Sequence, residues 1–136
     1  MITTFRDAFI AAFEYHRRDF VWTNDGVLRT TVMQSYVYPF MAKGLGYYLV
    51  CELPGDASLF GADAVHECLT TGGGYPRGPT IIVEHENVTC RSQKEMTDLA
   101  RWNARLNVLI TYASGSEAEQ LQWLSEQFSP LLVTAR

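Results

Sequence analysis

The sequence predicts a mixed α/β fold, formed by one domain of 136 residues. Two observations predict this class. Apolar side chains recur every three or four residues in 4–18 and 29–43, which is typical of helices. Short runs of β-branched and aromatic residues at 47–52, 80–86 and 106–112 are typical of strands. The chain is 47% hydrophobic and 19% charged, a composition that suits a globular domain with a buried core.

Two helices are expected first. In residues 4–18, Phe5 and Phe9 are four residues apart and share a face, and Thr4 with Asp7 has the spacing of a capping box.

The second helix is expected at 29–43. Pro39 either interrupts this helix or restarts it at a first-turn position, and Gly44 and Gly46 are expected to end it.

The remaining elements are expected in the order strand, strand, strand, helix, strand, helix. A turn at Pro54-Gly55-Asp56 separates the first two strands. The expected segments are 47–52, 62–69, 80–86, about 92–103, 106–112 and a last helix capped by Ser116, with 131–133 as a candidate edge strand.

Glu84 and Glu86 are the most informative side chains of the chain. They follow the apolar run Ile81, Ile82 and Val83, and residues two apart in a strand point to the same face. Two carboxylates at 4 Å repel by about 4 kcal/mol at an effective dielectric of about 20. A divalent cation, a cationic side chain or a shared proton would relieve that repulsion.

This order of elements, with acidic residues at particular strand positions, resembles the PD-(D/E)XK nuclease-like superfamily. The resemblance implies a restriction-endonuclease-like mixed sheet, an antiparallel meander plus a crossover helix and a further strand, flanked by helices. Asp63 and Glu84 match the first two acidic positions of the motif, and Glu86 stands where the family usually has Lys. Glu52 or Glu14 would supply the additional acidic residue that is common in the family.

The resemblance implies hydrolysis of DNA phosphodiester bonds with Mg²⁺ or Mn²⁺. Asp63 and Glu84, with Glu52, would hold the metal, since Mg²⁺ prefers oxygen ligands and is usually bound by one or two carboxylates. Glu86 would orient or deprotonate the attacking water. Lys94, on the helix after the third strand, would replace the missing motif lysine.

Two other classes of function remain open. The chain could be a catalytically inactive nuclease-fold protein that binds nucleic acid or protein, or a homo-oligomeric interaction protein whose acidic residues pair with a partner's arginines. A homo-oligomer or a larger complex is expected in each case, because so short a chain has little room for recognition loops. Glu84 and Glu86 could instead be an exposed edge pair that discourages aggregation.

Several classes are disfavoured by composition. A formal net charge of -4 argues against non-specific, high-affinity DNA binding. His66, Cys68, His85 and Cys90 lack the spacing of a zinc site. The three cysteines are too few for a disulfide framework, no apolar run reaches the roughly 18–20 residues of a membrane span, and the N-terminus lacks a secretory apolar region. A cytoplasmic protein without a membrane anchor is therefore expected.

Overall fold

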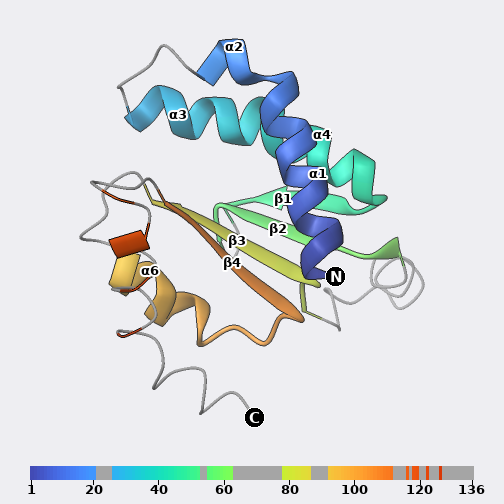
Figure 1. Cartoon of the computed structure of the whole chain (residues 1–136). Coiled ribbons are helices and arrows are strands. Elements are labelled where there is room, and N and C mark those ends of the chain that lie inside the picture. Colours follow the sequence, from blue (N-terminus) through green and yellow to red (C-terminus); the bar gives the residue numbers. More distant parts are fainter. Residues whose placement is uncertain are drawn as a thin grey trace.

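Helices lie on both faces of a four-stranded sheet (Figure 1). The computed structural model describes residues 1–20, 26–52, 55–62, 78–86 and 92–111, and also 116, 118, 119, 122 and 126. The elements are α1 (Ile2–Tyr15), α2 (Arg17–Phe20), α3 (Gly26–Val32), the π-helix η1 (Met33–Val37), α4 (Tyr38–Leu45), β1 (Tyr48–Cys51), β2 (Ala57–Phe60), β3 (Ile81–Glu86), α6 (Ser92–Leu99) and β4 (Leu106–Thr111).

The sheet is mixed, with the strand order β1-β2-β3-β4. β1 pairs with β2 and β2 with β3 in antiparallel fashion, whereas β3 and β4 are parallel. A parallel pair needs a crossover connection, and α6 lies in the segment that joins β3 to β4. The predicted mixed α/β class, with a mixed sheet flanked by helices, is confirmed.

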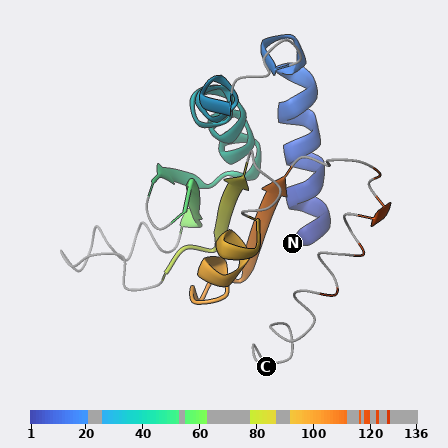
Figure 2. The ribbon, with the colours of Figure 1, turned by 90° about the vertical axis from the view of Figure 1, so that its left-hand side faces the viewer.

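The main core lies between the sheet and the helices that precede it. Val37 and Met41, on η1 and α4, are fully buried in one cluster with Leu59, Ile81 and Val83 of the sheet. Side chains alternate across a strand, so Ile82, Glu84 and Glu86 point to the opposite face. That face carries α6, which contacts β3 and β4 (Figure 2). The helices α1, α3, η1 and α4 are called the helical layer below.

The second strand differs from the prediction. The second strand of the described sheet is β2 at Ala57–Phe60, directly after the expected turn, and Ala62, the one described residue of the predicted segment 62–69, is not in a strand. All four residues of β2 are buried, so the strand has no alternation of polar and apolar side chains. The predicted segment 63–69 lies outside the described residues.

The predicted second helix is three consecutive pieces, α3, η1 and α4. Pro39 lies in the first turn of α4, so the restart at this proline is confirmed. Its ring nitrogen has no N–H, which removes one helical hydrogen bond and accompanies the wider π turn before it. Gly46 ends α4 with a left-handed φ of 68°, whereas Gly44 lies inside the helix.

Two capping predictions have opposite outcomes. α1 begins at Ile2 with Met1 as its N-cap and without a side-chain cap, so the Thr4–Asp7 capping box is wrong. Ser116 does act as a cap, since its Oγ accepts the backbone N–H of Glu119 at 3.2 Å. The candidate edge strand at 131–133 lies outside the described residues. Within the described part of the chain, no helix is long and apolar enough to cross a bilayer.

Candidate functional site

Of the predicted site residues, Glu52, Glu84, Glu86 and Lys94 are described, whereas Asp63 lies outside the described residues. Because the second strand is Ala57–Phe60, the acidic residue at its start is Asp56. The predicted pairing of Asp63 with Glu84 therefore stays a prediction, and the acidic residue that the structure places beside Glu84 is Asp56.

The carboxylates of Asp56 and Glu84 each accept a backbone N–H from the other's segment, at the start of β2 and the end of β3. The Asp56 carboxylate accepts the backbone N–H of His85, which follows Glu84, at a distance of 2.7 Å to Oδ2. In the other direction, the backbone N–H of Asp56 donates to the Glu84 carboxylate. A third hydrogen bond, from the Glu52 N–H to the Asp56 carbonyl at 3.3 Å, closes the β1–β2 hairpin behind them.

Gly55 explains why the hairpin can approach β3 so closely. A Cβ at this position would lie 2.8 Å from Ile82 Cγ2 and 2.9 Å from the Val83 carbonyl oxygen. It would also lie 3.2 Å from Glu84 Oε1. Only a residue without a side chain fits, and this lets Asp56 reach the end of β3.

Burial and mutual repulsion make both acids of this pair weak. The pKa of Glu84 is raised to about 7, chiefly by burial and then by the charges of Asp56 and Glu95. The pKa of Asp56 is also raised, mainly by burial, and the charges of Glu52, Glu95 and Glu86 add to that effect. The His85 N–H opposes it. The sheet thus holds Glu84 poised to gain or lose a proton near neutral pH.

Glu86 and Glu52 lie at the edge of this pair. Glu86 is half-buried on the same face as Glu84, and its charge contributes to the raised pKa of Asp56. Glu52 is exposed and has a positive φ of 65°, which is uncommon for a residue other than glycine. The Gln34 amide of η1 donates a hydrogen bond to the Glu52 carboxylate. A residue of the helical layer therefore holds Glu52 at the hairpin.

Lys94 lies in the same pocket as Glu84, but it is already ion-paired. Its Nζ is 2.8 Å from Asp98 Oδ2 and 3.7 Å from Glu95 Oε1, and the hydrogen bond with Asp98 raises the pKa of Lys94. The pocket has a volume of about 470 Å³. Its walls are Glu84, Lys94, Glu95, Asp98, Arg101 and Trp102.

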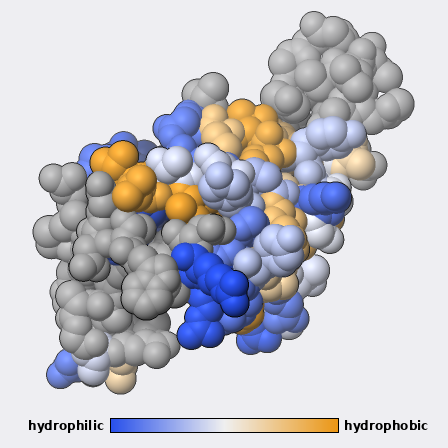
Figure 3. All heavy atoms as spheres, turned by 90° about the horizontal axis from the view of Figure 1, so that it is seen from above, coloured by the Kyte–Doolittle hydropathy of each residue, from blue (hydrophilic) through white to orange (hydrophobic). Residues whose placement is uncertain are grey.

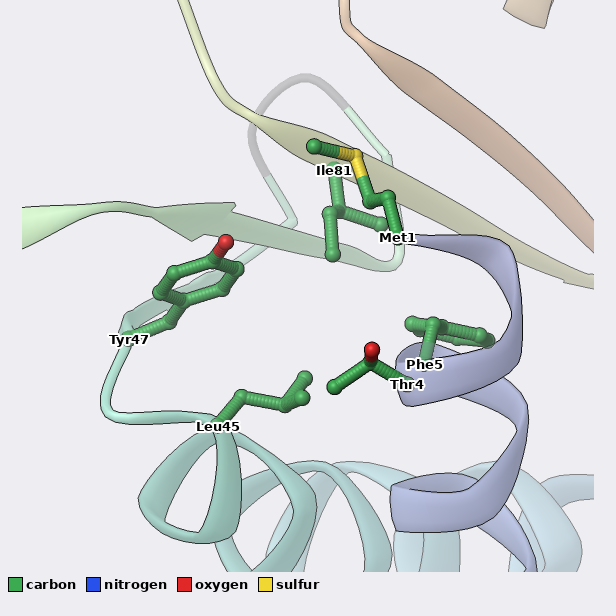
Figure 4. Close-up of a pocket in the computed structure, with 6 residues that line it drawn as sticks. All are labelled: Met1, Thr4, Phe5, Leu45, Tyr47 and Ile81. Carbon is green, nitrogen blue, oxygen red and sulfur yellow. The ribbon is translucent and has the colours of Figure 1, made fainter.

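A second pocket lies on the other side of the sheet, where α1 begins and α4 ends. It has a volume of about 220 Å³. Figure 4 shows side chains around a space whose polar side-chain atoms are two hydroxyl oxygens, those of Thr4 and Tyr47. The lining residues are Met1, Thr4, Phe5, Leu45, Tyr47 and Ile81. These six described residues include no side-chain acid or base suited to hydrolysis near neutral pH.

Among the described residues, the carboxylates of Asp56 and Glu84 form a pair that offers oxygen ligands to a metal ion. No group of three or more His, Cys, Asp and Glu residues able to hold a metal ion occurs among the described residues. Two carboxylates are nevertheless enough for Mg²⁺, which keeps several waters as ligands. His85 is directed away from the pair, and burial, with Arg29 nearby, lowers its pKa to about 4. Of the other candidate zinc ligands, His66, Cys68 and Cys90 lie outside the described residues.

Sequence reasoning missed Asp56 and the contribution of Glu95. The sequence predicts only a turn at Asp56, and for Glu95 a capping box with Ser92 at the start of a helix; Glu95 does lie in the first turn of α6, which begins at Ser92. The signal that could have found Asp56 is its place between Pro54-Gly55 and the apolar run that starts at Ala57. Comparisons of the chain with protein-family models, with curated proteins and with solved structures gave no match.

Proposed function

We propose that this chain is a metal-dependent phosphodiester hydrolase with a restriction-endonuclease-like fold, acting on DNA. The observation that carries the proposal is the pair of backbone hydrogen bonds, from His85 N–H to the Asp56 carboxylate and from Asp56 N–H to the Glu84 carboxylate, which gathers two weak, half-buried acids at the end of a central strand. Further support comes from the sheet, since an antiparallel meander, a crossover helix and a parallel strand are the core that the superfamily shares.

Asp56 and Glu84 would hold Mg²⁺ or Mn²⁺, with Asp56 taking the role predicted for Asp63. The donor set fits the ion, because both groups are oxygen ligands. The negative charge of Asp56 raises the pKa of Glu84, and a bound cation would offset this repulsion. When bound, the metal would supply a polarised phosphate oxygen and a water of lowered pKa.

The protein's own groups would then position substrate and proton. Glu86, on the same strand face as Glu84, would orient the attacking water. Glu84, with a pKa of about 7, can exchange a proton near neutral pH when no metal is bound. Lys94 and Arg101 line the pocket, and both form ion pairs with Asp98. They would bind the substrate's phosphate if they released Asp98.

The test is cleavage of DNA oligonucleotides with Mg²⁺ or Mn²⁺ by the wild type and by Glu84→Gln and Asp56→Asn. We expect metal-dependent cleavage that both substitutions reduce by about 100-fold or more, because each removes a carboxylate that would hold the metal ion, whose charge stabilisation is worth several kcal/mol. Glu14→Gln, which changes an exposed carboxylate of α1, is the matched control and should cleave at the wild-type rate. Cleavage by Glu84→Gln at the wild-type rate would reject the proposal.

A second candidate is a nuclease-fold protein that binds nucleic acid or protein without cleaving it. The observation that favours it is the lack of an unpaired lysine at the described site. Glu86 stands where the motif has lysine, and Lys94 is paired with Asp98 and Glu95. Gel shifts with uncleaved DNA, together with calorimetry in Mg²⁺, separate the two candidates. Metal binding that depends on Glu84 supports the hydrolase, and DNA binding without metal binding supports the second candidate.

A further inference from the structure

Four aromatic side chains meet on the outer side of the helical layer, far in sequence from the acidic pair. Tyr15 stacks on Phe40, with ring centroids 4.8 Å apart and planes at 27°. His16 joins them, 5.8 Å from Phe40 and 5.4 Å from Tyr36. We call these four residues the aromatic cluster. They link the end of α1, η1 and α4.

The rings of the aromatic cluster are open to solvent. Tyr15 is 72% exposed, Tyr36 50% and Phe40 39%, whereas Phe5, at the other end of α1, is 6% exposed. Phe40 covers one face of the Tyr15 ring, so the high exposure of Tyr15 comes from the remaining surface of its side chain, which is open to solvent. Single exposed apolar side chains are common on a surface, but exposed rings that meet in one cluster are typical of a binding surface.

Three exposed cations are close in sequence to these rings although the chain as a whole is acidic. Arg17 and Arg18 follow the cluster directly, and Lys43 lies one turn after Phe40 on α4. Arg17 has Glu14 at 3.7 Å, while Arg18 and Lys43 form no ion pair among the described residues. Figure 3 views the helical side and shows hydrophobic side chains beside strongly hydrophilic ones.

We propose that the aromatic cluster binds the unpaired bases of a single-stranded nucleic acid. Bases would stack on Tyr15 and Tyr36, and Arg17, Arg18 and Lys43 would face the phosphates. Open aromatic rings beside cations are the combination that single-strand binding requires, and each stacked base contributes about 1–3 kcal/mol. The bases of a duplex are stacked on one another, so their faces are not available to stack on Tyr15 and Tyr36.

A single strand explains the surface better than a lipid bilayer does. The most exposed rings are tyrosines and not the Trp, Phe and Leu side chains typical of helices that bind bilayers, and Arg17, Arg18 and Lys43 lie within three residues of a ring of the cluster. This surface belongs to the helical layer, and Glu84 lies on the other face of the sheet. The inference is therefore independent of the proposed hydrolysis.

The experiment is fluorescence anisotropy with labelled oligothymidylate and oligouridylate of about twelve nucleotides, a length within single-strand site sizes. A duplex of similar length is the comparison, and EDTA prevents metal-dependent cleavage. We expect both single strands to bind more tightly than the duplex. Tyr15→Ala and Tyr36→Ala should each weaken binding by about 5- to 150-fold, which is the loss of one stacked base. Tyr15→Phe and Tyr36→Phe keep the ring and should bind within about twofold of the wild type.

Matched controls separate the cluster from general effects. Tyr48→Ala removes a tyrosine of β1 that is 55% exposed, and it should bind like the wild type. Arg18→Gln removes one cation that faces a phosphate, so the slope of log K against log salt concentration should become shallower by about 0.7. Arg6→Gln, near the start of α1, should leave that slope unchanged.

Three results would overturn the inference. The first is wild-type protein that binds no single strand, and the second is equal binding of folded Tyr15→Ala and Tyr36→Ala, with circular dichroism as the folding check. The third is co-sedimentation with anionic lipid vesicles that these substitutions abolish while single-strand binding is unchanged, which would assign the surface to a membrane. A preference for the thymidylate or the uridylate strand would identify the natural ligand as DNA or RNA.

Discussion

Glu84 is a carboxyl group whose surroundings oppose its charge. It is half-buried, and Asp56 and Glu95 place negative charge near it, so its pKa rises to about 7 from an ordinary value of 4.5. The sequence alone predicts that Glu84 and Glu86 share a strand face and repel each other. The larger effect comes from burial and from Asp56, which is distant in sequence.

The raised pKa predicts how stability depends on pH. Between about pH 4.5 and 7 the folded protein holds a proton on Glu84 that the unfolded chain releases, so this contribution is fully present below pH 4.5 and is lost as the pH rises through 7. The raised pKa of Asp56 acts in the same direction. Since Glu84 is partly exposed, solvent screening limits the loss to about 1–2 kcal/mol.

Urea unfolding at intervals from pH 5 to about pH 8 checks this prediction. Glu84→Gln should gain stability relative to the wild type as the pH rises, because the glutamine cannot ionise. Glu14→Gln should follow the wild type at every pH. A constant difference between Glu84→Gln and the wild type across this range would contradict the assignment.

Asp56 shows why the site could be predicted only in part. Its residue type and its place after Pro54-Gly55 predict a turn, and the backbone does bend at Gly55 and Asp56. Its contact with the N–H of His85 depends on the length of the hairpin and on how β2 pairs with β3. Local patterns do not contain that information, because the partners are distant in sequence.

At the scale of elements, the hairpin of β1 and β2 is held against β3 at Gly55. The buried glycine leaves room for Ile82 Cγ2 and the Val83 carbonyl oxygen, which lie 2.8 and 2.9 Å from the position of a Cβ. This close approach places the start of β2, and with it Asp56, beside the end of β3.

Gly55→Ala is therefore expected to destabilise the protein by about 1–3 kcal/mol, the usual scale for an overpacked site. It should also lower any activity or metal affinity that depends on Asp56, because the hairpin has to move away from β3. Gly44→Ala is the matched control. It lies inside α4 with nothing within 4 Å of the new Cβ, so it should stabilise the protein by about 0.5–1 kcal/mol. Thermal unfolding of both variants measures the two effects, and equal shifts would show that the contact at Gly55 has no consequence.

The elements themselves were predictable where a pattern was long or where a residue type was decisive. β3 and β4 coincide closely with their predicted strands, and Gly46 ends its helix as expected. β2 was missed because four consecutive buried residues have neither a helical nor a strand period. The π turn of η1 was missed because Pro39 predicts a disturbance but not its form.

At the scale of the whole molecule, the sheet separates two surfaces of different chemistry. The face beneath α6 carries the acidic pair and its pocket, and the helical layer carries the aromatic cluster and its cations. The net charge of -4 is the sum over the whole chain, so it does not indicate the local charge of either surface.

Metal binding at the acidic pair should stabilise the entire fold. At a Mg²⁺ or Mn²⁺ concentration about ten times the Kd, the free energy of unfolding should rise by about 1.4 kcal/mol, since only the folded chain assembles the site. The gain should be larger at about pH 8 than at about pH 6, because the metal displaces the proton of Glu84. Differential scanning fluorimetry at matched ionic strength measures this effect. Glu84→Gln should lose it, and an equal shift in both proteins would indicate that the metal binds elsewhere.

The single π turn of η1 has a mechanical consequence. Gln34 reaches across to Glu52 at the hairpin, and Tyr36, two residues later, belongs to the aromatic cluster. One short stretch of backbone is thus anchored at both of the surfaces that the sheet keeps apart. Any rotation of that turn has to be accommodated at a strained glutamate on one side and at an exposed ring on the other.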